Sequence, residues 1–245
     1  MSLRICFIVN DLATFHGAGA MRHYLPADRF AVTVMEDFPG APASYDLIVP
    51  LSFRRVLPQA QAAGNVVVFH SSNLPEGRGW APLYQLIAQG KSDYVICGLL
   101  AADEVDAGDI VVRATFPILP GYTATWLRGL DEELMFLLTA RLAERFAGRS
   151  ITGLVQSGAP SYWPRRTPDD SRVDPDQTLR TLLPHLRAVE PAYPAFFEHD
   201  GVRYEVCVRP VGAVARPTVQ IHYLADDARE TWCDWLRPDE TGMPS

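Results

Sequence analysis

The stretch VVVFHSSNLPEGRG, residues 66–79, joins an apolar run to a histidine and a polar turn. Four apolar residues precede His70, and the serines, asparagine, proline and glycines that follow it are typical of turns. Near-continuous apolar runs form strands that are covered on both faces, as in the parallel sheets of α/β proteins. Ligands of such proteins bind beyond the carboxyl ends of the strands, so the stretch predicts an α/β fold with His70 at a functional site.

The N-terminal half repeats this alternation of strand-like and helical patterns. Helices are predicted over residues 81–90 and 124–147, and in the second of these a leucine recurs every four residues from Leu130 to Leu142. Strands are predicted over residues 3–10, 30–36, 45–51, 65–70, 93–100 and 109–116. This order of elements predicts an α/β fold with a Rossmann-like, mostly parallel sheet.

The sequence changes character after residue 156. Residues 158–177 contain four prolines and many charges, which indicates an irregular segment. A helix is predicted from residue 178, with a kink or restart at Pro184, and Asp200-Gly201 between extended runs predicts a hairpin. We therefore expect three parts: a main α/β domain (1–156), a smaller C-terminal α+β appendage (157–238) and a frayed tail (239–245).

Composition and charge restrict the classes of function. The 245 residues are 48% hydrophobic and 21% charged, which is ordinary for a soluble globular protein. A net charge of −7 argues against a large surface for nucleic-acid phosphates. No apolar run approaches the ~18 residues of a membrane span, the N-terminal run lacks a signal-peptide pattern, and the cysteines form no metal-binding pattern. We expect a cytoplasmic protein without a metal and without membrane or nucleic-acid partners.

The loop between the last two predicted strands of the main domain is acidic. It contains Asp103, Glu104, Asp106 and Asp109. Strands that are adjacent in sequence usually neighbour each other in space, which would bring one of these carboxylates close to His70. A histidine with an orienting carboxylate is a general acid/base pair. The alternative is that His70 and the acidic loop have only structural roles, because histidines at strand ends often only pack against their neighbours and acidic loops are usually solvated.

Several spaced motifs between residues 45 and 200 resemble the formyltransferase family that uses 10-formyltetrahydrofolate. In that family a strand ends in a catalytic histidine and is followed by a Ser-Leu-Leu-Pro-type turn, an Arg-Gly pair and an Asp-x-Gly loop. Matching positions occur here in the same order, at Ser72-Asn73-Leu74-Pro75, Arg78-Gly79 and Asp106-Ala107-Gly108. Residues 50–58 are similar to the family segment whose backbone lines the pterin pocket.

The resemblance implies roles for named residues. His70 would accept a proton from the acceptor amine and pass it towards the leaving nitrogen, while Asp106 would hold His70 and favour its charged form. The implied cofactor-binding residues are Phe53, Arg54, Arg55, Val56, Leu57, Ala102, Asp103, Glu104 and Val105. The implied substrate-binding residues are Asn10, Ser71, Ser72, Arg78, Gly79 and Trp80. Two alternatives stay open: Arg78 is an anion contact or a loop brace, and Trp80 stacks on a ligand or packs in the protein.

One position departs from the family pattern. The family has an asparagine two residues before the histidine, where it helps to stabilise the oxyanion, and this chain has Val68. Losing such a donor costs on the order of 10²–10³ in rate. Three interpretations follow. Another donor fills the role, with Asn73 as first candidate and Ser71 as second; the chemistry runs with histidine and aspartate alone; or the protein is an inactive relative that binds folate.

The resemblance also bears on the acceptor. The motif HxSxLPxGRGW (residues 70–80) looks most like that of formyltransferases that act on nucleotide-linked amino sugars of surface polysaccharides. We therefore expect the acceptor to be the amine of such a sugar. An N-hydroxyornithine-type amine of siderophore synthesis is the second candidate. Transfer RNA is disfavoured by the acidic charge and by the missing match to a C-terminal β-barrel. The loop NDLATFHGAGA (10–20) also lacks the glycine-rich phosphate pattern of glycinamide ribonucleotide formyltransferases. Family members often dimerise, so a homodimer is a further expectation.

Overall fold

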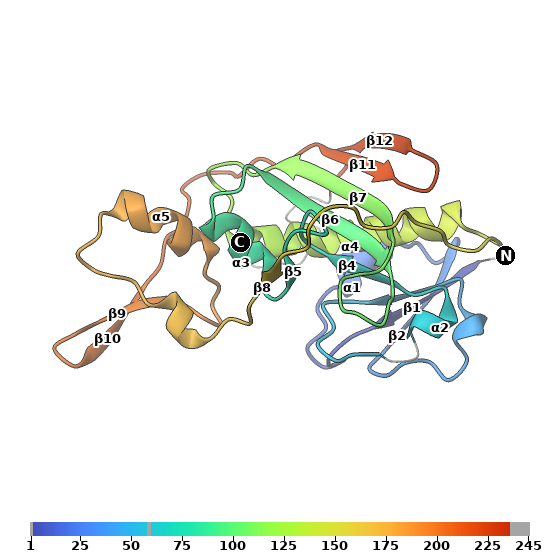
Figure 1. The fold of residues 1–245 in the computed structure, drawn as a ribbon, viewed down its shortest axis with the longest axis horizontal. Helices are drawn as coiled ribbons and strands as arrows, with labels where there is room; N and C mark the ends of the chain where they lie inside the picture. Colours follow the sequence, from blue (N-terminus) through green and yellow to red (C-terminus); the bar gives the residue numbers. More distant parts are fainter. Residues whose placement is uncertain (1, 58–59, 236–245) are drawn as a thin grey trace.

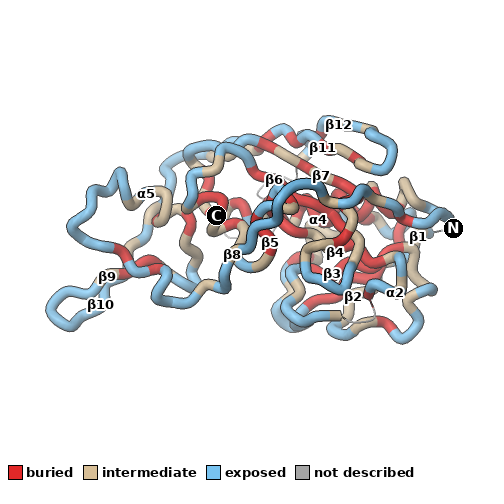
Figure 2. Tube along the Cα trace, viewed as in Figure 1, coloured by how far each residue is buried: buried red, intermediate tan, exposed pale blue. Residues whose placement is uncertain are grey.

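The structure, a computed structural model, describes residues 2–57 and 60–235. A sheet crosses the molecule, the long helix α4 packs behind it, and a smaller region projects at one end (Figure 1). The buried residues are concentrated in the central strands and in α4, whereas the projecting region is largely exposed (Figure 2). The α/β fold predicted from the sequence is confirmed.

The N-terminal strands form the parallel half of the sheet. Strands β2 (Phe30–Met35), β1 (Leu3–Ile8) and β3 (Leu47–Pro50) lie in this order, and both pairs are parallel. A parallel bridge between Ile48 and Val66 continues the sheet to β4 (Val67–His70). β1 is buried on both faces, because Ile5 and Phe7 join one apolar cluster while Cys6 and Ile8 join another. This explains the continuous apolar run of its sequence.

The other half of the sheet is antiparallel. Strands β4, β6 (Asp93–Leu100), β7 (Ile110–Pro117), β11 (Val219–Tyr223) and β12 (Ala228–Trp232) pair antiparallel in that order. The expectation of a mostly parallel sheet therefore holds for the N-terminal half alone. For β6 and β7 the reason is connection length, since the loop of residues 101–109 between them is too short for the crossover that parallel neighbours need.

The predicted helices are present. Helix α4 (Ala124–Arg145) begins at Thr123, whose hydroxyl accepts a hydrogen bond from the Trp126 amide at 3.2 Å, and its leucines face the sheet. Helix α3 (Pro82–Ala88) starts with proline in its first turn, as expected. The sequence did not predict the short elements α1 (Ala18–Tyr24), η1 (Pro42–Ser44) and α2 (Ala60–Ala63). In the described part of the chain, no helix has the length and apolarity needed to cross a bilayer.

The C-terminal region differs from its predicted outline. β5 (Arg78–Gly79) pairs with β8 (Tyr162–Trp163), and the chain continues through η2 (Pro168–Ser171) and α5 (Leu179–Ala188). Helix α5 runs through Pro184 as one element, so the helix does not restart there. The predicted hairpin is present as β9 (Ala195–His199) and β10 (Val202–Val206), with Asp200 and Gly201 in the left-handed conformations of its turn.

The last strands return to the main sheet. Because β11 pairs with β7, the hairpin of β11 and β12 belongs to the large sheet and not to the separate appendage predicted over residues 157–238. The projecting part is formed by η2, α5 and the β9–β10 hairpin (Figure 1). The predicted tail, residues 239–245, lies outside the described residues.

Candidate active site

His70 stands at the end of β4 with both ring nitrogens close to oxygen atoms. Its side chain is buried, its Nε2 lies 2.8 Å from the carbonyl oxygen of Gly77, and its Nδ1 lies 3.4 Å from Oδ2 of Asp106. A carbonyl oxygen can only accept a hydrogen bond, so Nε2 carries a hydrogen and donates it to Gly77. The neutral ring then offers Nδ1 as the proton acceptor, with the Asp106 carboxylate beside it to stabilise the charged ring.

The loop that carries Asp106 approaches His70 from the far end of β4. Because β4 and β6 are antiparallel, His70 is paired with Cys97, while Leu100 at the end of β6 is paired with Val67. The four residues of β4 span roughly 10 Å, and the loop after Leu100 folds back along this length. In the mostly parallel sheet predicted from the sequence, both loops would leave the same edge. The antiparallel pairing of β4 and β6 places them at opposite edges, and the folded-back loop still brings Asp106 to His70.

The backbone around Asp106 is held at several points. Asp106 has a φ of 57°, in the left-handed region that few residues other than glycine occupy. Its Oδ2 accepts a hydrogen bond from the Gly79 amide at 2.9 Å, and the side-chain amide of Gln156 donates to the carbonyl oxygens of Asp106 and Gly108 at 2.8 and 2.9 Å. At Gly108 the chain passes so close to β6 that an added Cβ would lie 1.8 Å from the carbonyl oxygen of Leu100.

Exchange of Gly108 for alanine is expected to lower the free energy of unfolding by about 1–3 kcal/mol, because the new methyl group must displace the loop or the strand. Urea denaturation measures this change. Gly40→Ala is the matched control, since an added Cβ there meets no atom within 4 Å. Its stability should stay within about 0.5 kcal/mol of wild type. If the two variants were equally stable, the close approach at Gly108 would be wrong.

Arg78 braces the acidic loop. Its side chain is buried, and its guanidinium donates to Glu104 Oε1 at 3.0 Å, to the Tyr162 hydroxyl at 3.1 Å and to Gln156 Oε1 at 2.8 Å. Both terminal nitrogens thus donate to protein partners. Of the two interpretations left open by the sequence, these contacts favour the loop brace over an anion contact.

The polar turn after His70 does not place the expected substitute donors against the ring. Ser71 is buried and donates its hydroxyl hydrogen to Asp131, and Ser72 is buried with its hydroxyl lacking a partner among the described residues. Asn73 is exposed. Val68 packs against an apolar cluster that includes Leu74. A catalytic role for Asn73 or Ser71 therefore stays a prediction.

A second buried carboxylate, Asp131 on α4, lies next to this turn and was missed by the sequence analysis. Both Ser71 and the hydroxyl of Tyr94 donate to its Oδ1. Burial raises the pKa of Asp131, while the hydrogen bonds from Ser71 and Tyr94 and the charges of Arg128 and His70 act in the opposite direction. A signal was present in the sequence, since an aspartate directly after Leu130 interrupts the buried face of a leucine-rich helix.

The stability of the wild type should depend on pH through Asp131. Its pKa in the folded chain is raised above the ordinary value of 3.8, so the unfolded chain releases this proton first as the pH rises. The contribution of Asp131 to stability is therefore largest below pH 3.8 and is lost as the pH rises through the raised pKa. Relative to Asp131→Asn, the free energy of unfolding of the wild type should fall over this range.

Urea denaturation at a series of pH values measures this difference. Asp176→Asn, at an exposed aspartate of the irregular segment, controls for the loss of one negative charge. A difference between wild type and Asp131→Asn that stays constant with pH, or grows in the opposite direction, would contradict the raised pKa.

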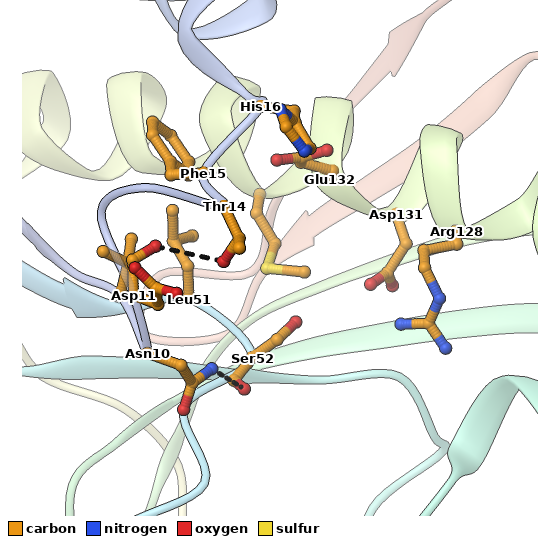
Figure 3. Close-up of a pocket in the computed structure, with 12 residues that line it drawn as sticks. Asn10, Asp11, Thr14, Phe15, His16, Leu51, Ser52, Arg128, Asp131 and Glu132 are labelled. Atoms are coloured by element: carbon orange, nitrogen blue, oxygen red, sulfur yellow. Dashed lines mark hydrogen bonds between the residues drawn. The ribbon is translucent and has the colours of Figure 1, made fainter. Parts of the chain in front are cut away.

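A cavity of about 280 Å³ opens at the carboxyl ends of β1 and β3, over α4 (Figure 3). Asn10 lies at its edge and joins two loops, since its amide donates to the Ser52 carbonyl at 2.9 Å and its Oδ1 accepts from the Arg54 amide at 3.0 Å. Asp131 lines the cavity and also accepts a hydrogen bond from Ser71, the residue that follows His70 in the chain. Its other charged and polar lining residues include Asp11, Thr14, His16, Arg128 and Glu132.

The two loops expected to hold the cofactor lie beside each other at the surface. The Gln61 side-chain amide, just after the first loop, faces the carboxylate of Asp103 in the second. Arg55 is tied down by hydrogen bonds to the carbonyl oxygen of Glu36 and to Asp37. The remaining members are exposed or half-buried, namely Phe53, Arg54, Val56 and Leu57 in the first loop and Ala102, Glu104 and Val105 in the second.

Trp80 and Gly79 lie on the side of the turn nearest the C-terminal region. Trp80 is exposed, and the guanidinium of Arg165 lies 5.1 Å from the centre of its ring. Gly79 has a φ of 99°, and an added Cβ would lie 2.6 Å from the carbonyl oxygen of Trp163. The contacts thus give Gly79 a role in the β5–β8 pair, and Trp80 remains 44% exposed. In the described residues no cluster of three or more histidines, cysteines, aspartates or glutamates could hold a metal ion.

Residues 38–137 match the family described as Formyl transferase. This part of the chain is similar to formyl transferase domains. The match includes His70, Asp106 and Asp131 and ends before Gln156. The geometry of the site can therefore be compared with what this domain does in related proteins.

Related proteins agree with the match. The methionyl-tRNA formyltransferase of Geobacillus thermodenitrificans is 29% identical over 160 residues, which are 64% of this chain and 50% of the relative. The chain thus spans about half the length of such relatives.

Solved structures show the same fold. HypX from Aquifex aeolicus superposes with a TM-score of 0.70 and 20% identity, covering 94% of this chain and 45% of that one. HypX in complex with tetrahydrofolic acid superposes with a TM-score of 0.67 at 19% identity, covering 94% and 43%. A 4-N formyltransferase from Francisella tularensis superposes with a TM-score of 0.65 and 14% identity, covering 86% and 99%. At these identities the likeness concerns the fold alone.

Proposed function

We propose that the protein transfers a formyl group from 10-formyltetrahydrofolate to a primary amine of a small molecule. The observation that carries the proposal is the buried pair of His70 and Asp106, 3.4 Å apart, within the formyl transferase domain. A histidine whose Nε2 is fixed by a backbone carbonyl and whose Nδ1 faces a carboxylate is suited to general acid/base chemistry. The cofactor supplies the activated formyl group.

The residues around the two exposed loops fit a planar, partly apolar cofactor. Val56 on the first loop is 69% exposed and Val105 on the second is 58% exposed, so both present apolar surface without a protein partner that covers it. The backbone of residues 53–57 and 102–105 offers hydrogen-bonding groups on either side. We propose these loops as the site that would hold the pterin ring, as the resemblance to the family implied.

His70 and its neighbours handle the proton in this proposal. Nδ1 of His70 would accept a proton from the amine as the amine nitrogen bonds to the formyl carbon, and would pass this proton to the cofactor nitrogen whose bond to that carbon breaks. Asp106 stabilises the ring while it is charged. The fixed hydrogen bond from Nε2 to Gly77 keeps the ring orientation constant during the transfer. Asp131 holds Ser71 and thereby the end of β4 from which His70 projects. The chain has Val68 where the family has an asparagine, so Asn73 remains the proposed donor to the oxyanion.

The acceptor amine would occupy the cavity beside Asp131. Arg128 is already paired with Glu190 at 2.7 Å, which leaves the carboxylates of Asp11, Asp131 and Glu132 as the dominant charges there. Carboxylates attract an amine in its charged form. We propose an amino sugar linked to a nucleotide as the first candidate. The fold resembles that of a 4-N formyltransferase, and the sequence of the turn after His70 resembles that of amino-sugar formyltransferases. Methionyl-tRNA is the second candidate, because it is the substrate named for the sequence relatives.

Turnover with a panel of amines tests this function. The panel contains nucleotide-linked 3-amino and 4-amino sugars, an N-hydroxyornithine-type amine and methionyl-tRNA, each incubated with 10-formyltetrahydrofolate. Formation of the formylated product from an amino sugar is the expected result. Product from another member alone would replace the sugar as acceptor. Folate binding without turnover of any amine would overturn the enzymatic function and leave an inactive folate-binding relative.

A further inference from the structure

The segment of residues 154–163 runs along both loops of the active site. Leu154 and Ile110 exchange backbone hydrogen bonds of 2.8 and 2.9 Å at the end of the acidic loop. Further along the segment, the Ser161 hydroxyl accepts a hydrogen bond from the Gly77 amide, and the Ser161 carbonyl oxygen accepts one from the Arg78 amide. The formyl transferase match ends at residue 137, so this contact segment lies outside the matched domain.

Gln156 is the point where this segment meets the catalytic aspartate. Its Nε2 donates to the carbonyl oxygens of Asp106 and Gly108, at 2.8 and 2.9 Å, and its Oε1 accepts from Arg78 at 2.8 Å. The amide therefore uses both of its ends and joins the acidic loop to the turn that follows His70. A carboxylate of the same size could accept from Arg78 but could not donate to two carbonyl oxygens.

The geometry points to Gln156 as the positioning residue of Asp106. Asp106 is held in the left-handed region with φ 57°, and such a conformation persists only where the surroundings determine it. The two bonds from Gln156 fix the carbonyl groups on either side of Ala107, which sets the direction in which the Asp106 carboxylate meets Nδ1 of His70. Gln156 acts through Asp106 and need not touch either substrate. The inference about catalysis rests on the proposed function.

Gln156→Met, which keeps the length of the side chain and removes its polar atoms, tests the inference in two ways. In formyl transfer it should lower kcat by about 10²-fold and change KM for the acceptor by less than about threefold, since a misplacement of about 1 Å costs this much. In the background of Asp106→Asn, the same exchange should cost less than about threefold, because residues that act as one unit are not additive. Equal losses in both backgrounds would overturn the positioning role.

Amide hydrogen exchange supplies a readout that needs no activity. Gln156→Met and Gln156→Glu should both increase exchange over residues 102–109, while Gln177→Met, at an exposed glutamine, should leave it unchanged. Unchanged exchange in the Gln156 variants would overturn the inference even if the wild type transfers formyl groups. If the wild type transfers none, the proposed function fails and the exchange measurement alone decides whether Gln156 holds the loop. Thermal unfolding confirms that each variant is folded.

Discussion

Exchange of His70 for glutamine is expected to lower the rate of formyl transfer by about 10³-fold, with the chain still folded. Glutamine can keep a hydrogen bond to the Gly77 carbonyl, but it has no group that accepts a proton from an amine at neutral pH. The loss should appear in kcat, because in the proposed reaction Nδ1 accepts the proton of the attacking amine and does not bind the substrate. Single-turnover measurement with excess enzyme separates this step from product release.

The chain contains a matched control for this exchange. His199 lies in the exposed β9–β10 hairpin with Nε2 3.4 Å from Oδ2 of Asp200, the same separation as in the buried pair. Its side chain is 72% exposed, against 8% for His70. His199→Gln should leave the rate within about twofold of wild type, since exposed pairs of this kind contribute little. If the His70→Gln enzyme were as active as this control, His70 would have no role in catalysis.

Exchange of Asp106 for asparagine is expected to lower kcat by about 10²-fold. The amide oxygen can still accept the hydrogen bond from Gly79, and asparagine tolerates a φ of 57°, so the loop should keep its shape. What is lost is the negative charge beside Nδ1, which stabilises the imidazolium as the proton arrives. The effect should therefore fall on kcat, with KM for both substrates changed by a smaller factor.

Asp200→Asn is the control for Asp106→Asn. Asp200 also adopts a left-handed conformation, with φ 50°, and also lies beside a histidine, but its side chain is 90% exposed. Its exchange should leave formyl transfer unchanged. An Asp106→Asn enzyme with wild-type kcat would show that the carboxylate only shapes the loop. Amide hydrogen exchange over residues 102–109 then distinguishes a lost charge from a displaced loop.

The sequence by itself determined the elements and the two chemical groups of the site. The strands β1 to β4, β6 and β7 and the helix α4 follow from local patterns, because apolar periodicity over a few residues already decides which side chains can be buried. His70 and Asp106 were identified from a strand-end histidine and a spaced family motif, and the structure places them 3.4 Å apart. These are features that a short stretch of chain specifies without knowledge of its partners.

The direction of the strands and the support of the site were decided by the tertiary structure alone. β6 and β7 run antiparallel to their neighbours, and β11 joins β7 from more than 100 residues away. Ser71 meets Asp131 across 60 positions, and Asp106 meets Gln156 across 50. No local pattern encodes such pairings, because a buried hydroxyl or amide takes whichever partner the packed sheet and α4 bring within hydrogen-bonding distance. The proposed chemistry could be inferred from a motif, whereas the alignment of its groups depends on residues that become neighbours when the chain folds.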